Sequence, residues 1–425
     1  MDHFQLRDGT LHAEDVPLDA LAVEVGTPAY VYSTATLSRH YGVLRDAVAA
    51  HPAAFGDALI AFAVKANANL SVLATLARLG SGADTVSEGE IRRALRAGIP
   101  AGKIIFSGVG KTDAELAWAL DVGVRQINVE SPAELDRLIA VAAEKGRVPD
   151  IAIRVNPKIG AGGHAKITTG GEGDKFGIPA DEAMALYARA AASPHVTPVG
   201  LACHIGSQII DLSPLEAAFR LLREMTLTLR GQGLSVTRLD LGGGLGVPYS
   251  GGAETASVAD YAAMAAGVLD GLAVEAAFEP GRLLAANAGV LLARVIQITE
   301  RADGRRFLVL DAAMNDLVRP AMYDAFHEVK PVTPRDGDRI AYDIVGPVCE
   351  TGDTFARARD LPPLQAGDLV VFTGAGAYGA VMASEYNSRP LVPEVLVDGE
   401  RRAVVRGRPT YEEMLAREAV AGWLS

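Results

Sequence analysis

Eight short apolar runs alternate with amphipathic helical stretches, and this alternation constrains the fold more than any other feature. The runs cover residues 58–65, 81–86, 103–108, 125–130, 150–156, 198–204, 236–244 and 274–280. Fully apolar strands that alternate with helices predict a parallel sheet whose two faces are both covered. Eight such units in roughly 250 residues fit an α/β fold of the (β/α)8, TIM-like barrel type. A doubly wound open sheet is the alternative, and the number of units favours the barrel.

The helical stretches carry start and stop signals. Ser87 and Glu90 have capping-box spacing, and Thr112 and Glu115 repeat it. A third helix is expected to begin at Pro132 and to end at Gly146.

The alternation of apolar runs with helical stretches ends after about residue 285. Segments such as "RRFLVLDA", "RIAYDIVGPV" and "GDLVVFTGAGAY" are β-rich, with Gly, Pro and Asp between them. They predict a mostly antiparallel β domain after the barrel, into which the early strand at 28–33 can pair. We therefore expect a barrel domain at 34–284, and a β-rich domain formed by 1–33 plus 285–425.

Composition narrows the class of protein. The 425 residues carry a formal net charge of -12 with no lysine or arginine block, which argues against binding nucleic acid or an anionic membrane. The two cysteines, Cys203 and Cys349, are far apart and suit a reducing cytoplasm. The polar N-terminus does not resemble a signal peptide, and no apolar stretch is long enough to span a bilayer. We expect a cytoplasmic protein, and we predict no metal site.

Polar residues or glycines stand at the ends of six of the runs. They are Lys65, Asp84, Arg154, His204, the glycine-rich segment 242–246 and Glu279. Because the active site of a parallel barrel lies at the carboxyl ends of its strands, we expect these positions to converge.

Several of these positions have two interpretations. Lys65 is either a lysine that snorkels at a strand rim or an amine that forms a Schiff base with a carbonyl compound. Glu279, in "FEPGR", pairs either with Arg282 or with the protonated ring nitrogen of a cofactor. His204 is either a satisfied core histidine or a flat ring that stacks on an aromatic cofactor, with Ser207 offering a hydroxyl to a phosphate.

The segment "LGGGLG" is either a phosphate cradle of backbone N–H groups or a tight turn. Its glycine spacing does not match G-x-G-x-x-G, and Pro248 follows where a helix is required. A dinucleotide-binding oxidoreductase is therefore disfavoured.

The β-rich region contributes a second group of candidates. Cys349 is either an inert thiol or a proton donor, and Glu350 is its neighbour. Tyr378 lies among glycines, where backbone can approach a ligand closely. Arg319 and Tyr323 are suited to binding an anion, because arginine can bind a carboxylate through two hydrogen bonds.

Together these motifs resemble one family. "FAVKANAN", "GADTVSEGE", "CHIGSQ", "LDLGGGLG", "FEPGR", "RPAMY", "GPVCETGD" and "GAYGAVMASEYNSRP" occur in the order typical of diaminopimelate decarboxylases, which are pyridoxal-phosphate-dependent enzymes of fold type III. The resemblance extends from residue 27 to residue 420.

The resemblance implies a cofactor, pyridoxal 5'-phosphate, held by Lys65 as an internal aldimine. Asp84 supports Lys65, His204 stacks on the ring, and Glu279 pairs with the pyridinium nitrogen. The other residues implied to bind the cofactor are Ser207, Gly243, Gly244, Gly281, Arg282 and Tyr378. A glutamate at the ring nitrogen favours decarboxylation over racemisation, because it keeps the ring an electron acceptor.

The resemblance also implies the substrate, meso-2,6-diaminopimelate, which is converted to L-lysine and CO2. The residues implied to bind it are Arg282, Arg319, Tyr323, Glu350 and Tyr378. Cys349 is implied to protonate the substrate carbon, and in the family Cys349 and Glu350 come from the neighbouring subunit of a homodimer. Decarboxylation of another basic or carboxylated amino acid and a non-catalytic carrier of the cofactor remain as alternatives.

Two departures from the family pattern stand out. Phe62 replaces the commoner tyrosine of the lysine motif, and an aromatic of similar shape is expected to be tolerated. The glycine-rich loop between residues 157 and 178 lacks the usual acidic and histidine spacing, so no role is assigned to His164 or Lys166.

Overall fold

The computed structural model describes residues 2–160, 169–171, 173, 175–249 and 255–424; His164 and Lys166 lie outside these ranges. The chain divides into two compact units. One, the barrel unit, is Leu37–Leu284. The other, the β unit, combines Met1–Thr36 with Ala285–Ser425.

The barrel unit is a closed ring of eight parallel strands. Its strands are β5 (Leu59–Ala63), β6 (Gly82–Thr85), β7 (Ile104–Phe106), β8 (Gln126–Val129), β9 (Asp150–Asn156), β11 (Thr197–Ala202), β12 (Arg238–Asp240) and β13 (Glu275–Phe278), and a short β10 (Ile178–Pro179) adds to β9. The last strand pairs with the first, Ala277 opposite Leu59 and Phe278 opposite Ile60, and this closes the ring. The predicted (β/α)8 barrel is confirmed, and the open sheet is excluded.

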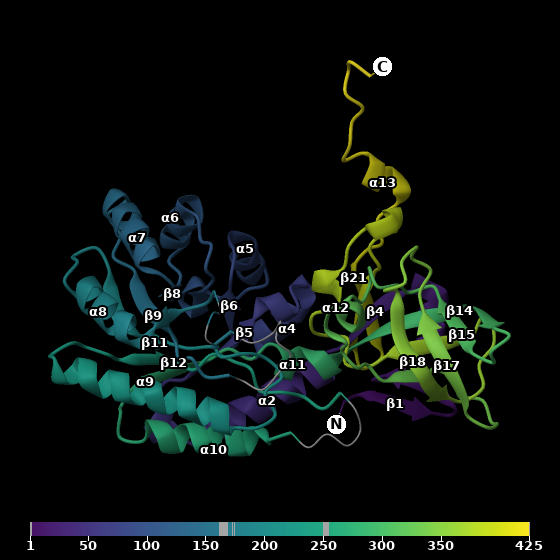
Figure 1. Cartoon of the computed structure of the whole chain (residues 1–425), viewed down its shortest axis with the longest axis horizontal. Helices are drawn as coiled ribbons and strands as arrows, with labels where there is room; N and C mark the ends of the chain where they lie inside the picture. Colours follow the sequence, from purple (N-terminus) through teal and green to yellow (C-terminus); the bar gives the residue numbers. More distant parts are fainter. Residues whose placement is uncertain (1, 161–168, 172, 174, 250–254, 425) are drawn as a thin grey trace. The chain divides into compact units, whose positions relative to one another are not determined.

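Two helices precede the first strand of the ring, and the others follow or connect the strands. They are α2 (Thr34–Ala49), α3 (Pro52–Phe55), α4 (Leu70–Arg78), α5 (Glu88–Arg96), α6 (Asp113–Val122), α7 (Pro132–Lys145), α8 (Ala180–Ala191), α9 (Ser213–Gly231), α10 (Val258–Leu269) and α11 (Arg282–Ala285). Figure 1 shows α5 to α10 around the strands.

The predicted helix signals act as expected at two helices and differ in one detail at α5. Thr112 and Glu115 form a complete capping box at α6. Pro132 occupies the first turn of α7, and Gly146 ends that helix in the left-handed conformation with φ 61°. At α5 the Ser87 hydroxyl accepts the N–H of Glu90, but the Glu90 carboxylate accepts the N–H of Val86 rather than that of Ser87.

The β unit contains a mixed, mostly antiparallel sheet in the order β18-β17-β15-β14-β4-β20-β21. The strands are β4 (Ala29–Ser33), β14 (Gly289–Glu300), β15 (Arg306–Leu310), β17 (Ile340–Val345), β18 (Thr354–Leu361), β20 (Glu394–Asp398) and β21 (Arg401–Arg406), and β19 (Leu369–Phe372) joins β14 to β16 (Val329–Pro331). Strand β4 lies between β14 and β20, as predicted for residues 28–33.

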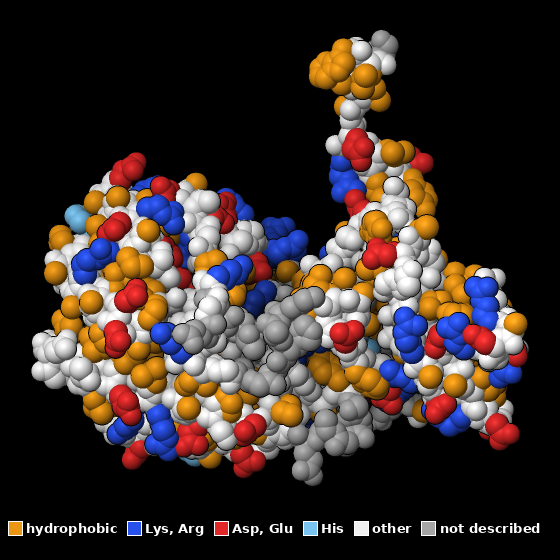
Figure 2. All heavy atoms as spheres, viewed as in Figure 1, with side chains coloured by type: hydrophobic (Ala, Val, Ile, Leu, Met, Phe, Trp, Pro, Cys, Tyr) orange, Lys and Arg blue, Asp and Glu red, His pale blue; other side chains and the backbone are white. Residues whose placement is uncertain are grey.

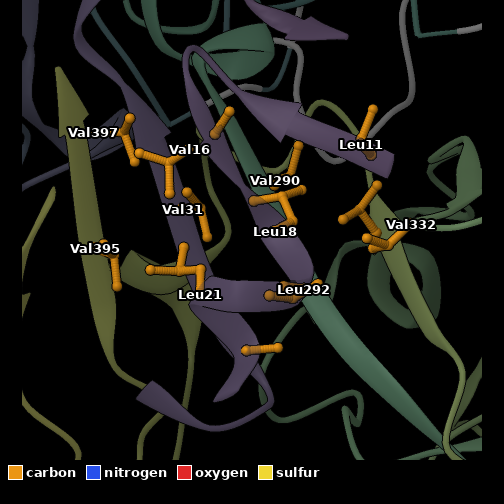
Figure 3. Close-up of a cluster of buried hydrophobic side chains, with 13 residues drawn as sticks. Leu11, Val16, Leu18, Leu21, Val31, Val290, Leu292, Val332, Val395 and Val397 are labelled. Carbon is orange, nitrogen blue, oxygen red and sulfur yellow. The ribbon is translucent and has the colours of Figure 1, made fainter. Parts of the chain in front are cut away.

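A small N-terminal sheet and three short helices complete the β unit. They are β1 (Phe4–Arg7), β2 (Thr10–Ala13), β3 (Val16–Pro17), α1 (Leu18–Val25), α12 (Arg319–Tyr323) and α13 (Tyr411–Leu415). Leu18 and Leu21 of α1 pack with Val31, Val290 and Val395 of the main sheet (Figure 3). Burying each such side chain contributes about 1.5–3 kcal/mol, so this apolar cluster fixes the N-terminal segment on the sheet.

The surface of the barrel unit carries charges of both signs. Figure 2 shows lysine and arginine side chains interspersed with aspartate and glutamate on the visible face. Within the described part of the chain, no helix combines the length and the apolar character needed to cross a membrane.

Candidate active site

Lys65 stands directly beyond a barrel strand. Strand β5 ends at Ala63, and Lys65 lies in the short 3-10 helix Val64–Ala66 that follows. Its Nζ lies 3.2 Å from Oδ2 of Asp84, whose side chain is fully buried at the end of β6, whereas the lysine side chain is 35% exposed. The amine is therefore held by a buried carboxylate and still reaches solvent.

Backbone hydrogen bonds bring the segment around Glu279 to the same end of the barrel. The N–H of Ala63 donates to the carbonyl of Pro280 (3.1 Å), and the N–H of Glu279 donates to the carbonyl of Gly242 (2.7 Å). The ends of β5, β12 and β13 are thus joined, which brings the segments of Lys65, Gly242 and Glu279 together.

Glu279 is a buried carboxyl in an acidic surrounding. Burial raises its pKa well above the usual range, the charges of Asp240 and Asp84 raise it further, and the Lys65 charge acts in the opposite direction. Among the described residues, no donor reaches Oε1 of Glu279 or Oδ1 of Asp84. A buried carboxyl oxygen that accepts no hydrogen bond is unusual, and a cationic N–H of a ligand fits it.

His204 is a neutral imidazole. Burial lowers its pKa well below the usual range, and the Lys65 charge lowers it further. Its Nδ1 lies 3.2 Å from the N–H of Gly243 and accepts that bond, so the ring proton is on Nε2. A flat, uncharged ring at this position suits stacking on an aromatic ligand.

The glycine-rich segment makes close backbone approaches. A Cβ at Gly243 would lie 2.2 Å from the carbonyl oxygen of Glu279, and one at Gly244, whose φ is 114°, would lie 2.5 Å from that of Gly206. No other residue fits these positions. The Gly243 N–H already donates to His204, so an anion here would compete with that bond.

Arg282 extends this region with a positive charge. Its Nε and Nη2 donate to the Ser207 hydroxyl at 3.1 and 3.0 Å, and its Nη1 donates to the Tyr249 hydroxyl at 2.5 Å. The guanidinium is thus bound to the hydroxyls of Ser207 and Tyr249. Gly281 is buried beside it at the start of α11.

Sequence reasoning missed three residues of this end of the barrel. Asp240 is buried beside Glu279, Asn128 donates a hydrogen bond to Asp240, and the Tyr249 hydroxyl accepts one from Arg282. The position of Asp240 carried a signal, because a carboxylate two residues before a glycine run, at a strand end, is out of place in an apolar strand. Arg154, in contrast, was anticipated at its strand end and is bound there by Glu130 at 2.7 Å.

In the β unit, Arg319 is held rigidly. It begins α12, is buried, and its Nη1 lies 2.9 Å from Nε2 of His327. His327 Nδ1 lies 2.8 Å from the carbonyl oxygen of Thr373, so Nδ1 donates there and Nε2 accepts from Arg319. Tyr323 is the last residue of the same helix and is half-buried.

Cys349 and Glu350 lie in the segment between β17 and β18, and both are exposed. The N–H of Cys349 donates to Oδ1 of Asn387 at 3.0 Å. A hydrogen bond with Glu350 raises the pKa of Tyr386. Tyr378 has a φ of 57°, a strained conformation for a residue other than glycine and one that is frequent at ligand sites.

Pyridoxal phosphate requires three kinds of binding group, and this end of the barrel contains all three. Its aldehyde needs an amine, its phosphate needs N–H, hydroxyl and cationic groups, and its ring nitrogen needs a carboxyl group. The fold and the site define a barrel enzyme of the pyridoxal-phosphate-dependent class.

Comparison with known proteins identifies the family. The family model described as pyridoxal-dependent decarboxylase, pyridoxal binding domain, matches residues 42–286. A protein of Zymomonas mobilis named diaminopimelate decarboxylase is 49% identical over 422 residues, which cover 99% of each chain. The chain belongs to the diaminopimelate decarboxylase family of pyridoxal-dependent decarboxylases.

Solved structures agree. Diaminopimelate decarboxylase of M. jannaschii, in a co-complex with L-lysine, matches with a TM-score of 0.95 and 34% identity over 100% of this chain and 99% of that one. The Helicobacter pylori enzyme, also complexed with L-lysine, matches with a TM-score of 0.90 and 38% identity over 94% and 98% of the two chains.

Proposed function

We propose that this chain removes CO2 from meso-2,6-diaminopimelate to form L-lysine, the last step of lysine biosynthesis. The observation that carries the proposal is the presence, at one end of the barrel, of both the Lys65 amine, which Asp84 holds, and a buried Glu279 carboxyl whose Oε1 accepts no hydrogen bond. The full-length similarity to relatives named diaminopimelate decarboxylase, two of them solved with L-lysine bound, supports the substrate.

In this proposal Lys65 binds the aldehyde of the cofactor through its amine, and Asp84 orients that amine. Bound pyridoxal phosphate supplies an electron acceptor for the electron pair left when CO2 departs. Glu279 keeps the ring nitrogen protonated, and the neutral His204 ring stacks on the cofactor. A carboxyl group at the ring nitrogen favours decarboxylation over racemisation.

The phosphate is assigned to the groups around Arg282. Ser207 and Arg282 lie within hydrogen-bond distance of each other, and the backbone near Gly243 and Gly244 admits no side chain. We assign Gly281 and Tyr378 to the same role, Gly281 because it directly precedes Arg282 and Tyr378 because of its strained turn.

The distal end of the substrate carries both an amine and a carboxylate, and therefore needs one cation-binding and one anion-binding group. We assign the carboxylate to Arg319, which His327 holds in place, and the amine to Glu350. Arg282, Tyr323 and Tyr378 complete this set. Cys349 is the proposed proton donor to the substrate carbon after CO2 has left.

We propose further that the active enzyme is a homodimer in which Cys349 and Glu350 act in the neighbouring subunit's site. Their exposure supports this, and so do the apolar side chains at the end of the β unit: Leu415, Val420, Trp423 and Leu424 are 69%, 77%, 87% and 74% exposed. This C-terminal segment, marked C in Figure 1, is lined with hydrophobic side chains in Figure 2.

The proposed domain division follows from these roles. The barrel domain, 34–284, binds the cofactor, and the β-rich domain, 1–33 plus 285–425, completes the site and the dimer interface. We also propose that the enzyme acts in the cytoplasm and binds no nucleic acid, in keeping with its net charge of -12.

Release of CO2 from a panel of amino acids tests the function. We expect release from meso-diaminopimelate, with L-lysine as the product, and little from ornithine, arginine or lysine. Preference for ornithine or lysine would establish the alternative, a decarboxylase of a basic amino acid. Cofactor binding without CO2 release from any of the four would favour a non-catalytic carrier.

A further inference from the structure

Asp240 is a buried carboxylate beside Glu279 whose two oxygens both accept hydrogen bonds. It ends β12 and is 2% exposed. Its Oδ2 accepts from Nδ2 of Asn128 at 2.9 Å, and its Oδ1 accepts from the N–H of Gly242 at 3.0 Å. Asp240 is in turn hydrogen-bonded to the Glu279 side chain.

The surroundings fix the orientation of Asn128. Its Oδ1 accepts from Nε2 of Gln126 at 2.8 Å, and its Nδ2 also reaches the Ser107 hydroxyl at 3.1 Å. Turning the amide over would place two donors, or two acceptors, opposite each other. The group that Asn128 presents to Asp240 is therefore an N–H donor, and Oδ2 of Asp240 must accept.

A hydrogen bond between two carboxyl groups requires one proton. Because both oxygens of Asp240 already accept N–H bonds, the proton belongs on Glu279. Burial also raises the pKa of Asp240 above its usual range, although its hydrogen bonds with Glu279, Asn128 and Gly242 act in the opposite direction. The other charged groups facing the pair are Asp84, which raises both pKa values, and Lys65, which lowers that of Glu279.

We propose that Asp240 is a positioning residue that keeps a proton on Glu279 in the cofactor-free protein, and that Glu279 donates this proton to the ring nitrogen when pyridoxal phosphate binds. The Oε–H bond of Glu279 breaks and an N–H bond forms on the ring, so the proton moves inside the site and the net charge of the site is unchanged. The inference rests on the proposed role of Glu279.

This arrangement has a physical advantage over a preformed pair of carboxylates. Two ionised carboxylates side by side in a buried site would repel each other strongly. With one proton on Glu279, the cofactor-free site carries a single negative charge on this pair. After the transfer, the fixed charge of Asp240 remains close to the new cation and stabilises it.

Infrared difference spectroscopy between the cofactor-free and the cofactor-loaded protein tests the proposal at a pH near 8. We expect the C=O band of a neutral carboxylic acid in the cofactor-free protein, lost when pyridoxal phosphate binds. The same band is expected to persist when the 1-deaza analogue binds, because that ring has a C–H in place of the nitrogen. Glu279→Gln is expected to remove the band altogether.

Asp240→Asn is expected to abolish the loss of the band on loading, because Glu279 is then ionised beforehand. Asp316→Asn, which removes an aspartate of similar burial in the β unit, is the matched control and is expected to leave the difference spectrum unchanged. Should Asp240→Asn fail to fold, Asn128→Ala is expected to shift the band, since a less firmly held Asp240 takes a larger share of the proton.

Two different failures are distinguishable. If Glu279→Gln weakens binding of pyridoxal phosphate but not of the deaza analogue, and yet no band is lost on loading, the proton transfer is wrong while the role of Glu279 stands. If Glu279→Gln affects both cofactors equally, the proposed position of Glu279 at the ring nitrogen is wrong. An unshifted band in Asn128→Ala, or an unchanged band loss in a folded Asp240→Asn, overturns the role of Asp240.

Discussion

The candidate residues of the barrel unit and those of the β unit differ in how they are held. In the barrel unit, Lys65 is paired with buried Asp84, and Arg282 with Ser207, so the candidates fix one another. In the β unit Arg319 is hydrogen-bonded to buried His327, whereas Cys349 and Glu350 are exposed on a connecting segment. Under the proposed function, the barrel unit supplies the groups that bind the cofactor, and Cys349 and Glu350 are the exposed groups that would act in the site of a partner subunit.

The largest expected effect concerns Lys65. Lys65→Ala removes the amine that binds the cofactor, and we expect CO2 release to fall by at least about 10³-fold. We also expect the variant to lack the yellow colour that bound pyridoxal phosphate gives to the protein. Absorbance and single-turnover assays measure both. Lys103→Ala, which removes a lysine at the opposite end of a barrel strand, is the control and keeps both properties. Full activity of Lys65→Ala would contradict the proposed role of Lys65 in binding the cofactor.

Cys349→Ala tests the contribution of the β unit separately from that of the barrel unit. We expect the protein to keep its colour and its affinity for pyridoxal phosphate while kcat falls by about 10²- to 10⁴-fold, because a proton donor is lost. The matched control is Cys203→Ala, the other cysteine, whose thiol is buried in the barrel unit and has its pKa raised by burial. An unchanged kcat in Cys349→Ala would remove this residue from the proposed role.

Arg319→Ala tests the recognition of the substrate. Loss of a charge-assisted hydrogen bond costs roughly 1.5–3 kcal/mol, so we expect KM for diaminopimelate to rise about 10- to 100-fold. The exposed Arg335, which is paired with Asp368, serves as control in Arg335→Ala. If KM does not change in Arg319→Ala, the assignment of the distal carboxylate is wrong.

The smallest expected effect is on stability, and it tests how strongly burial perturbs a carboxyl group of the barrel unit. Burial raises the pKa of Glu90, at the start of α5, to about 7. A raised pKa contributes stability that is complete below the unfolded value, about 4.5, and is lost as the pH rises through about 7. We therefore compare the free energy of unfolding of Glu90→Gln with that of the parent at pH 5 and at pH 8. Between these two pH values the difference is expected to shift in favour of Glu90→Gln by about 1–3 kcal/mol.

Thermal unfolding at the two pH values measures this effect of Glu90. Glu88→Gln is the control on the same helical turn, since the Glu88 carboxylate is in a partly exposed ion pair with Arg92. Equal pH dependence of the parent and Glu90→Gln would show that Glu90 is solvated like a surface carboxylate.

Much of the fold was predictable because local sequence patterns determine its strands and helices. Apolar runs, caps and stop residues gave the eight strands and their order, and polar residues at strand ends gave Lys65, Asp84 and Glu279. The pairing of Asn128 with Asp240 was not predictable, because these residues are 112 positions apart and meet only through closure of the barrel. The orientation of Arg282 depends on Tyr249 and Ser207 in the same way, on loops whose paths no local pattern determines.

The central claim is that Lys65 carries pyridoxal phosphate covalently, and one measurement addresses it directly. The loaded protein is reduced with borohydride, digested, and the peptides are mapped by mass spectrometry. The account predicts a pyridoxyl group on the peptide that contains Lys65, at close to one per chain, with none on the peptides of Lys103 or Lys111. A label on another lysine, or no label in a protein that still releases CO2 from diaminopimelate, would contradict it.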